Sequence, residues 1–556
     1  MEITLNIFKS FKDRRQRSYW PLLLFLLSFI ISAPVLFILS HLLMPFSDSW
    51  AHLFETVLSD YILNSIALML GVGLGTLILG LGAAWLTAMC EFPGRKFFAW
   101  AFLLPLAMPA YIIAYTYTGI LDFAGPVQST LREVFNWDYG DYYFPNVRSL
   151  GGAICMLTLV LYPYVYMLVR VALSEQSTAI LEASRILGKS SWQSLFSVAL
   201  PMARPAIVAG ITLALMETLA DYGTVEFFGV STFTTGIFRT WYGLGELQTA
   251  AQLCSFLLLF VFFLIILEKK SRNKLRFHQN KAVVKLSKIK LTKLWVAAAV
   301  FFSGSLVALG FFIPAIQLLF WTIDYWNNVW DSDFIYLLFN SFSLAAISAS
   351  VCALVAILLA YSKREFKNKA AHTSVGIAGI GYAVPGTVIA IGVLIPAAWL
   401  DNHLDYLSTA YLDMPIGLLL SGSMMILVFA YLVRFLSISL NTMDSGLSAI
   451  KPGLDESARS LGASRKNVLT KIHIPMLKTS VLTAFLLVFV EVMKELPTTL
   501  ILRPFNFNTL AVKTYELASD ERLLDAALPA LCIVMISLIP ILFVSKSIVI
   551  DKAKHE

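Results

Sequence analysis

Residues 182–202 have the sequence EASRILGKSSWQSLFSVALPM, and residues 456–476 have the sequence ESARSLGASRKNVLTKIHIPM. The second stretch repeats the first without a gap, at an offset of 274 residues (from 182 to 456). Identical residues stand at Glu182/Glu456, Arg185/Arg459, Leu187/Leu461, Gly188/Gly462, Ser190/Ser464, Leu195/Leu469, Pro201/Pro475 and Met202/Met476. Both stretches are polar and lie between long apolar runs, so we call them the first and second islands. Their recurrence at a fixed offset predicts two exposed elements with the same role.

The composition indicates an integral membrane protein. The chain of 556 residues is 58% hydrophobic and 14% charged, whereas soluble domains carry about 25% charged residues. Apolar runs of about 20 residues, long enough to cross a bilayer, recur along the whole chain. We therefore expect an all-α polytopic fold with about twelve transmembrane helices. The predicted spans are 20–43, 61–90, 97–121, 150–174, 202–222, 249–268, 294–321, 335–362, 372–399, 411–440, 477–498 and 524–549.

The charges of the connecting loops predict the orientation. Lys and Arg gather after the even-numbered spans and in both islands, while Asp and Glu gather in the intervening loops. Basic loops stay in the cytoplasm, so we expect both islands and both termini on the cytoplasmic side of the membrane. The net charge of +7 is spread over these short loops, which does not predict a nucleic-acid surface. The first apolar run is too long for a cleaved signal peptide, so we expect a retained span.

Two homologous halves are the simplest organisation. A basic linker, residues 269–293, separates a first half, 1–268, from a second half, 294–556. Because each half contains six spans, the halves should be parallel repeats related by an axis along the membrane normal. Further landmarks recur at almost the same offset, namely Asn64-Ser65 with Asn340-Ser341 and Pro109 with Pro385. Glycines 71, 73, 75, 80 and 82 in the second span predict close helix packing.

Each island predicts a helix, a glycine turn and a second helix. Glu182 or Glu456 falls near the start of a short helical stretch, where a carboxylate favours the positive end of the helix dipole. Gly188 or Gly462 then provides a turn that other residues disfavour. Pro201 or Pro475 stands where the first turn of the next span is expected. The predicted product is a small knob on the cytoplasmic surface.

Ionisable residues follow each island inside the next span. Glu217 and Asp221 in the first half match Glu491 and Glu495 in the second at the same offset of 274. A spacing of four residues places each pair on one helical face, and intramembrane charges mark functional sites by default. Carboxylates suit a hard cation, so Glu217 and Glu491 are candidate metal ligands on a translocation pathway. The alternative is structural: Lys494 neutralises Glu491, or the acids cap broken helices.

The islands resemble the signature loop of permease subunits in bacterial binding-protein-dependent ABC importers. That pattern is Glu-Ala-Ala, three residues, Gly, and a later Leu-Pro. The matching residues are Glu182, Ala183, Ser184, Gly188 and Leu200-Pro201, and then Glu456, Ser457, Ala458, Gly462 and Ile474-Pro475. Ser184, Ser457 and Ile474 depart from the pattern. The resemblance implies the type I permease fold and docking of each island, including Arg185 and Arg459, onto one of two cytoplasmic ATPase subunits.

The stretch around the acids is similar to the fused permeases of ferric-iron importers. It runs ETLADYGT over residues 217–224 and continues to Tyr242. This resemblance implies that Fe(III) arrives from a periplasmic iron-binding protein. Fused permeases for thiamine or another small solute share the architecture and are the alternative.

The chain itself is not expected to be an enzyme or to bind a cofactor. Leu187-Gly188-Lys189-Ser190 looks like the end of a phosphate-binding loop, but Ala183 stands where that motif needs its first glycine. ATP is therefore expected to be used by a partner subunit. A twelve-span secondary transporter is a more distant alternative, although nothing in that mechanism needs paired cytoplasmic islands.

Overall fold

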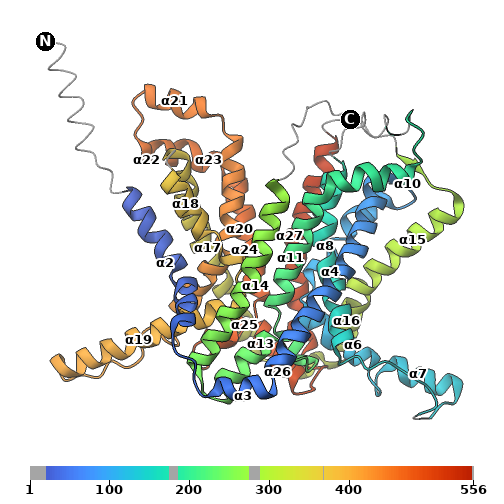
Figure 1. The fold of residues 1–556 in the computed structure, drawn as a ribbon, viewed down its shortest axis with the longest axis horizontal. Helices are drawn as coiled ribbons and strands as arrows, with labels where there is room; N and C mark the ends of the chain where they lie inside the picture. Colours follow the sequence, from blue (N-terminus) through green and yellow to red (C-terminus); the bar gives the residue numbers. More distant parts are fainter. Residues whose placement is uncertain are drawn as a thin grey trace.

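The structure is a computed structural model that describes residues 20–138, 140–174, 184, 186–273, 288–366 and 369–553. The described residues form a bundle of long helices with two arms that extend sideways near one end (Figure 1). The first half contains α2 (Trp20–Ser40), η1 (His41–Leu43), α3 (Ser49–Thr56), α4 (Leu58–Met89), β1 (Cys90–Glu91), α5 (Arg95–Ala101), η2 (Leu104–Ala107), α6 (Ala110–Leu121), α7 (Pro126–Phe135), α8 (Leu150–Ser174), α10 (Ser191–Ser194), η3 (Leu195–Ala199), α11 (Leu200–Ala220), α12 (Gly223–Phe227), α13 (Phe233–Phe238), η4 (Arg239–Gly243) and α14 (Leu247–Asn273).

The second half repeats this order. It contains β2 (Ile289–Lys290), α15 (Lys293–Val307), η5 (Ala308–Phe312), α16 (Ile313–Val329), α17 (Ser332–Glu365), α18 (Lys369–Ala378), η6 (Gly381–Ala383), α19 (Gly386–Leu412), α20 (Met424–Ala449), α21 (Pro452–Ser460), α22 (Arg465–Val468), η7 (Leu469–His473), α23 (Ile474–Met476), α24 (Lys478–Lys494), α25 (Pro497–Leu502), α26 (Leu510–Ser519) and α27 (Ala527–Ala553). The two short strands, β1 and β2, pair in parallel. Most of the predicted linker, residues 274–287, lies outside the described residues.

The polytopic all-α prediction is confirmed, with changes to individual spans. Among the described residues, nine helices are long and apolar enough to cross a membrane, or up to eleven when two bent pairs are each counted as one span. The predicted third span, 97–121, is one of these pairs, because the chain turns by 92° between Ala107 and Ala110. The predicted ninth span, 372–399, is divided among α18, η6 and the start of α19. The predicted twelfth span, 524–549, corresponds to α27, which begins with the apolar stretch Ala527–Leu542.

The repeated landmarks occupy equivalent positions in the two halves. Asn64 donates a side-chain hydrogen bond to the Ser231 carbonyl at 3.0 Å, and Asn340 donates one to the Asn508 carbonyl. The hydroxyls of the adjacent serines accept backbone amides at the starts of α13 and α26. Pro109 and Pro385 precede α6 and α19 with nearly the same backbone angles. These shared details confirm that the halves are structural repeats.

Close packing through the glycines of α4 is also confirmed. Added Cβ atoms at Gly71, Gly75 and Gly80 would collide with residues of α8. At Gly80 the collision would include the Tyr162 carbonyl, which is backbone and has no freedom to rotate away. The two helices therefore approach more closely than larger side chains allow, as is typical of helix pairs in membranes.

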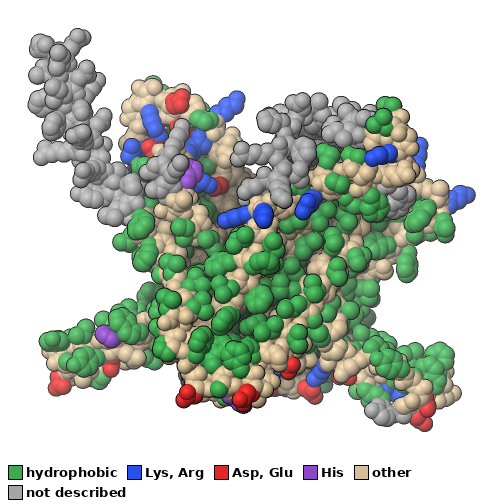
Figure 2. All heavy atoms as spheres, viewed as in Figure 1, with side chains coloured by type: hydrophobic (Ala, Val, Ile, Leu, Met, Phe, Trp, Pro, Cys, Tyr) green, Lys and Arg blue, Asp and Glu red, His purple; other side chains and the backbone are tan. Residues whose placement is uncertain are grey.

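The halves are interlocked. Helix α2 of the first half packs against α18, α19 and α20 of the second half, while α15 and α16 of the second half pack against α5 and α6 of the first. Figure 2 shows Lys and Arg side chains near the upper end of the molecule and Asp and Glu near the lower end. The described parts of both islands lie at the basic end (Figure 1). Assignment of that end to the cytoplasm stays a prediction from the charge pattern.

Candidate functional site

The second island has the predicted helix–glycine–helix geometry. Helix α21 ends at Ser460, Gly462 adopts a left-handed φ of 83°, and the Ser464 side chain caps α22. The left-handed angle explains why glycine is needed at this turn. One detail differs from the prediction. Because α21 begins at Pro452, its first-turn carboxylate is Asp455 and not Glu456.

The first island is described in part. Glu182, Ala183 and Arg185 lie outside the described residues, so their predicted role stays a prediction. Gly188 has a φ of 84°, which matches Gly462. The hydroxyls of Ser184 and Ser194 are hydrogen-bonded at 2.6 Å, so the residue that departs from the Ala-Ala pattern helps to close this island. Pro201 lies in the first turn of α11, as predicted, whereas Pro475 lies in the separate short helix α23.

The end of α17 anchors the second island. Glu365, which is buried, forms ion pairs with Arg459 and Arg465. Arg364 contacts Asp455 at 2.8 Å, and His473 contacts the other oxygen of Asp455 at 2.7 Å. Burial raises the pKa of Asp455, but hydrogen bonds from Arg364 and His473 outweigh it and hold the pKa below its usual value of 3.8. Arg459, predicted as a docking residue, therefore also holds the island to the bundle.

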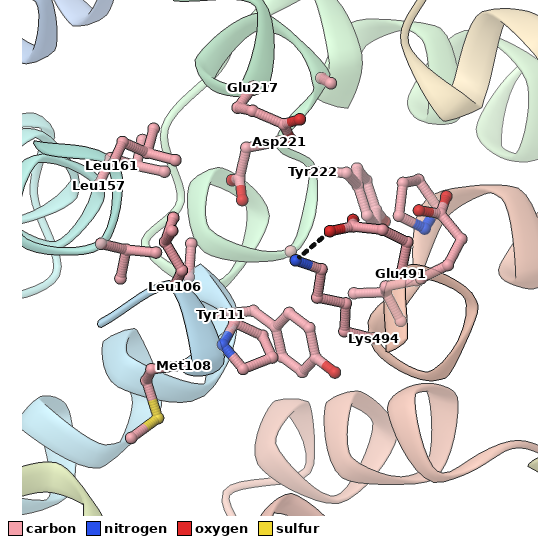
Figure 3. Close-up of a pocket in the computed structure, with 18 of the residues that line it drawn as sticks. Leu106, Met108, Tyr111, Leu157, Leu161, Glu217, Asp221, Tyr222, Glu491 and Lys494 are labelled. Carbon is pink, nitrogen blue, oxygen red and sulfur yellow. Dashed lines mark ion pairs between the residues drawn. The ribbon is translucent and has the colours of Figure 1, made fainter. Parts of the chain in front are cut away.

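A cavity of about 120 Å³ contains all four acids predicted for the pathway. Its wall includes Glu217 and Asp221 from the end of α11 and Glu491 and Glu495 from the end of α24. Figure 3 shows that Glu217 and Asp221 lie across the cavity from Glu491 and Lys494. The fixed offset in the sequence thus corresponds to two facing walls of one site, contributed by the two halves.

Three of the four acids also have structural partners. Glu491 forms an ion pair with Lys494 at 2.9 Å, and Glu495 forms one with Arg434 at 3.0 Å. Glu495 additionally accepts the amide and hydroxyl of Thr498 at the start of α25. Asp221 accepts the amides of Thr224 and Val225 at the start of α12. Helix capping and neutralisation, the structural alternatives from the sequence, therefore both occur in this cavity.

Glu217 has a different environment. The hydroxyl of Tyr382 lies close enough to interact with its carboxylate, and Tyr164 lies close to Tyr382. Among the described residues, its carboxylate forms no ion pair within 4.0 Å. Tyr382 belongs to the second half, so this contact joins the two halves at the cavity. Glu217 is consequently the acid whose charge is most available to a cargo.

The charges of the cavity are asymmetric between the halves. Both cations, Arg434 and Lys494, come from the second half. The residues 274 positions earlier are Val160 and Ala220, which carry no charge. Four carboxylates therefore face two cations, which leaves an excess of two negative charges when all six groups are ionised. Such a cavity attracts cations and repels anions.

The four cavity acids, all among the described residues, do not form a cluster of metal ligands. Within the described residues, no group of three or more His, Cys, Asp or Glu side chains is close enough to hold a metal ion. The proposed ligand pair, Glu217 and Glu491, stays a prediction.

Arg434 is the main cavity residue that the sequence analysis missed. It lies within the predicted tenth span, in the run YLVRFL, and its guanidinium is almost fully buried. A single Arg in an apolar run signals a functional or paired residue. The sequence repeat does not reveal Arg434, because the equivalent residue of the first half is the uncharged Val160. Gly386 packs against Arg434, Glu495 and Thr498 in this corner of the cavity. A Cβ at Gly386 would overlap Arg434 and crowd the other two side chains.

Known proteins similar to this chain are transport permeases. The Fe(3+)-transport system permease protein FbpB 2 of Haemophilus influenzae is 26% identical over 542 residues, which cover 96% of this chain and 99% of that protein. The ferric transport system permease protein FbpB of Actinobacillus pleuropneumoniae is 24% identical and covers 77% of this chain and 62% of its own length. The molybdenum transport system permease protein ModB of Escherichia coli is 26% identical over 31% of this chain and 71% of its own length.

A family match covers both halves. The family described as binding-protein-dependent transport system inner membrane component matches residues 76–276 and again residues 352–550. The two matches contain the four cavity acids and both islands. They agree with the repeat seen in the sequence and in the helix order. The chain belongs to this family of binding-protein-dependent transport permeases, as a fused form that carries both halves in one polypeptide.

Proposed function

We propose that this permease moves ferric iron inward across the bacterial inner membrane as the channel-forming subunit of an ABC importer. A periplasmic iron-binding protein delivers the ion at the acidic end. Two copies of a cytoplasmic ATPase engage the islands at the basic end and supply the energy, and both termini face the cytoplasm. The carboxylate-rich cavity between the two halves is the observation that carries this proposal.

Charge supports a cationic cargo. The cavity combines four carboxylates with phenol hydroxyls, and hard cations prefer such oxygen ligands. An oxyanion such as molybdate would meet an excess of negative charge there. The near full-length similarity to a permease named for Fe(3+) supports ferric iron in particular.

The helices that connect the islands with the cavity support coupling to ATP. Helix α11 begins within the first island, at Leu200, contains Glu217 and ends at Ala220, next to Asp221. Helix α24 follows the second island and ends at Lys494, next to Glu495. Each island is therefore one helix away from the cavity. A displacement of an island by the ATPase would move the corresponding acidic wall.

The test of the cargo compares the acids of the two walls. Glu217→Ala should abolish most uptake of radioactive ferric iron in cells lacking the native protein, while assembly with the ATPase is retained. Glu491→Ala should also reduce uptake, but this change leaves Lys494 unpaired, which destabilises by up to about 3–5 kcal/mol in buried pairs. The double variant Glu491→Gln/Lys494→Met separates the two effects, because it removes the acid without leaving a lone charge. Full uptake in the Glu217 and double variants would assign these acids to structure.

Coupling is tested separately at the islands. Glu182→Ala combined with Glu456→Ala should abolish uptake, because the proposed contacts with the ATPase are lost. Glu133→Ala, on the exposed end of α7, serves as the matched control and should leave uptake unchanged. If the purified chain brings down no ATPase and the double island variant transports normally, the proposed ABC mechanism is wrong. Uptake of thiamine in place of iron would support the alternative cargo.

A further inference from the structure

Helix α19 leaves the bundle sideways and ends in an arm. The arm comprises residues 399–421, that is, the last part of α19 and the segment that returns toward α20. In Figure 1, α19 runs outward across the direction of the long helices, near the acidic end of the molecule. The acidic residues of this stretch lie in a predicted external loop, but the structure shows an ordered helix with a returning segment packed against it.

Polar side chains on one face of α19 hold the returning segment. Asp401, which is fully buried, accepts the backbone amides of residues 419, 420 and 421 at 3.2, 2.8 and 2.6 Å. Asp405 accepts the amides of residues 416 and 417 at 2.9 and 2.8 Å. Ser408 donates to the carbonyl of Met414 at 2.7 Å. Spacings of four and three residues place these three side chains on the same helical face, which the returning backbone covers.

The apolar side chains of the arm point the other way. Trp399, Tyr406 and Tyr411 are 59%, 71% and 82% exposed. Other exposed large hydrophobic residues of the arm are Leu400, Leu407, Leu412, Met414, Ile416, Leu418 and Leu419. No Lys or Arg occurs between Lys369 and Arg434. The arm therefore differs from a water-exposed hairpin: Asp401 and Asp405 are turned inward, the aromatic and aliphatic residues are turned outward, and of its three carboxylates only Asp413, at the tip, is exposed.

The other arm, around α7, also exposes large hydrophobic residues, but it exposes several charged side chains beside them. Its end carries Arg132, Glu133, Asp138 and Asp141. Arg132 donates to the Tyr142 hydroxyl and the Phe123 carbonyl, so the polar groups of this arm form an ordinary surface network. Because both arms extend from the bundle near the same end of the molecule (Figure 1), the α7 arm can be compared directly with the α19 arm.

We propose that the α19 arm is embedded in the outer leaflet of the bilayer, at the boundary between headgroups and acyl chains. Trp and Tyr are enriched at this boundary, where an amphipathic ring contacts both environments. Figure 2 shows hydrophobic side chains along the arm, beside the apolar flank of the bundle. The lipid-facing surface of the bundle therefore continues onto the arm, and lipid is the occupant that fits both. This inference does not depend on the cargo.

Helix α19 connects the arm with the cavity. Gly386, the first residue of α19, lies against Arg434 and Glu495. The same helix continues to Leu412 within the arm. A lipid-embedded arm would therefore hold the cavity end of α19 in place while other helices move.

Site-specific labelling tests the arm in the full chain. A cysteine-free variant carrying Tyr406→Cys is labelled with an environment-sensitive fluorophore and reconstituted into phosphatidylcholine nanodiscs. Tyr143→Cys is the matched control, at an exposed tyrosine that follows α7 (91% exposed, against 71% for Tyr406). Leu412→Cys replaces Tyr406→Cys if that variant fails to fold. Lipid-borne nitroxide should quench the label at position 406. Aqueous iodide should quench this label several-fold less than the label at position 143.

Other outcomes would overturn the proposal. Equal quenching by iodide at 406 and 143 would place the arm in water. Protection from iodide that appears only after addition of the soluble binding protein would make the arm a protein-docking surface. Protection that appears only at high ratios of protein to lipid would assign the arm to contacts between copies of the chain.

Discussion

The guanidinium of Arg434 interacts electrostatically with acids from both halves, namely Glu495, Glu217 and Glu491. One of its nitrogens, Nε, has no hydrogen-bond partner within the part of the chain that the structure describes. Burying a charged group with an unpaired N–H donor costs folding free energy unless an acceptor binds that donor. Arg434 thus limits the negative charge of the cavity and retains the capacity for one more contact.

Gly386 tests the importance of this corner. In Gly386→Ala the new methyl group would overlap Arg434, and such overpacking costs about 1–3 kcal/mol. We expect a lower melting temperature of the purified chain and reduced iron uptake. Gly304→Ala is the matched control, because a Cβ at this helical position meets open space and should be neutral or slightly stabilising. Equal melting temperatures for the two variants would contradict the assigned contact.

The residues of the cavity were predictable only where the sequence repeats. The offset of 274 identified Glu217, Asp221, Glu491 and Glu495, and all four line one cavity. Arg434 has no repeated counterpart and Gly386 carries no charge, so neither follows from the pattern. The contact between Glu217 and Tyr382 joins residues far apart in the chain, and only the tertiary packing brings them together.

At the scale of elements, the helices break where the acids lie. Helix α11 ends before Asp221 and α24 ends before Glu495, and each acid then hydrogen-bonds the start of the next short helix. The sequence indicated these breaks only as one alternative, because an acidic pair inside an apolar run is equally compatible with an unbroken helix. Pro497 marks the second break, but the first half has Gly223 at that position. The boundaries were therefore less predictable than the helices themselves.

The anchoring of the second island predicts a local effect of Glu365. Glu365→Gln removes the charge that holds Arg459 and Arg465, so trypsin should cleave after these two arginines faster than in the wild type. Glu456→Gln, an exposed change on the same island, is the control and should leave the cleavage rate unchanged. Equal rates in all three proteins would show that the ion pairs do not restrain the island.

Asp455 determines how the contacts that hold the second island to the end of α17 depend on pH. Its pKa is lower in the folded chain than the usual 3.8, so its stabilising contribution is complete above that value and is lost only as the pH falls through the lowered pKa. Trypsin-sensitive opening of the island should therefore change little between neutral pH and about pH 5. Cleavage at neutral pH after Asp455→Asn should approach that of the Glu365→Gln variant.

At the scale of the whole molecule, the two halves exchange their first helices. Because α2 packs on the second half and α15 and α16 pack on the first, the halves are held together by packing as well as by the linker. The sequence predicted two parallel halves but not this exchange, since the apolar surface of a membrane helix does not indicate its partner.

Interlocking predicts that the linker is dispensable for association. Co-expressed fragments 1–280 and 281–556 should purify together through a tag on one fragment, and the pair should retain ferric uptake. Deletion of residues 1–43, which removes α2, should weaken the association. Separation of the intact fragments on purification would contradict the packing described for α2, α15 and α16.

The proposed function requires that the cavity passes a cation under the control of ATP. The direct measurement is uptake of radioactive ferric iron and, separately, of molybdate into proteoliposomes containing the permease, its ATPase and its binding protein. We predict iron accumulation that requires ATP in the wild type, strong loss of this accumulation in Glu217→Gln, and no accumulation of molybdate. Molybdate uptake, or undiminished iron uptake by Glu217→Gln, would show that the proposed function is wrong.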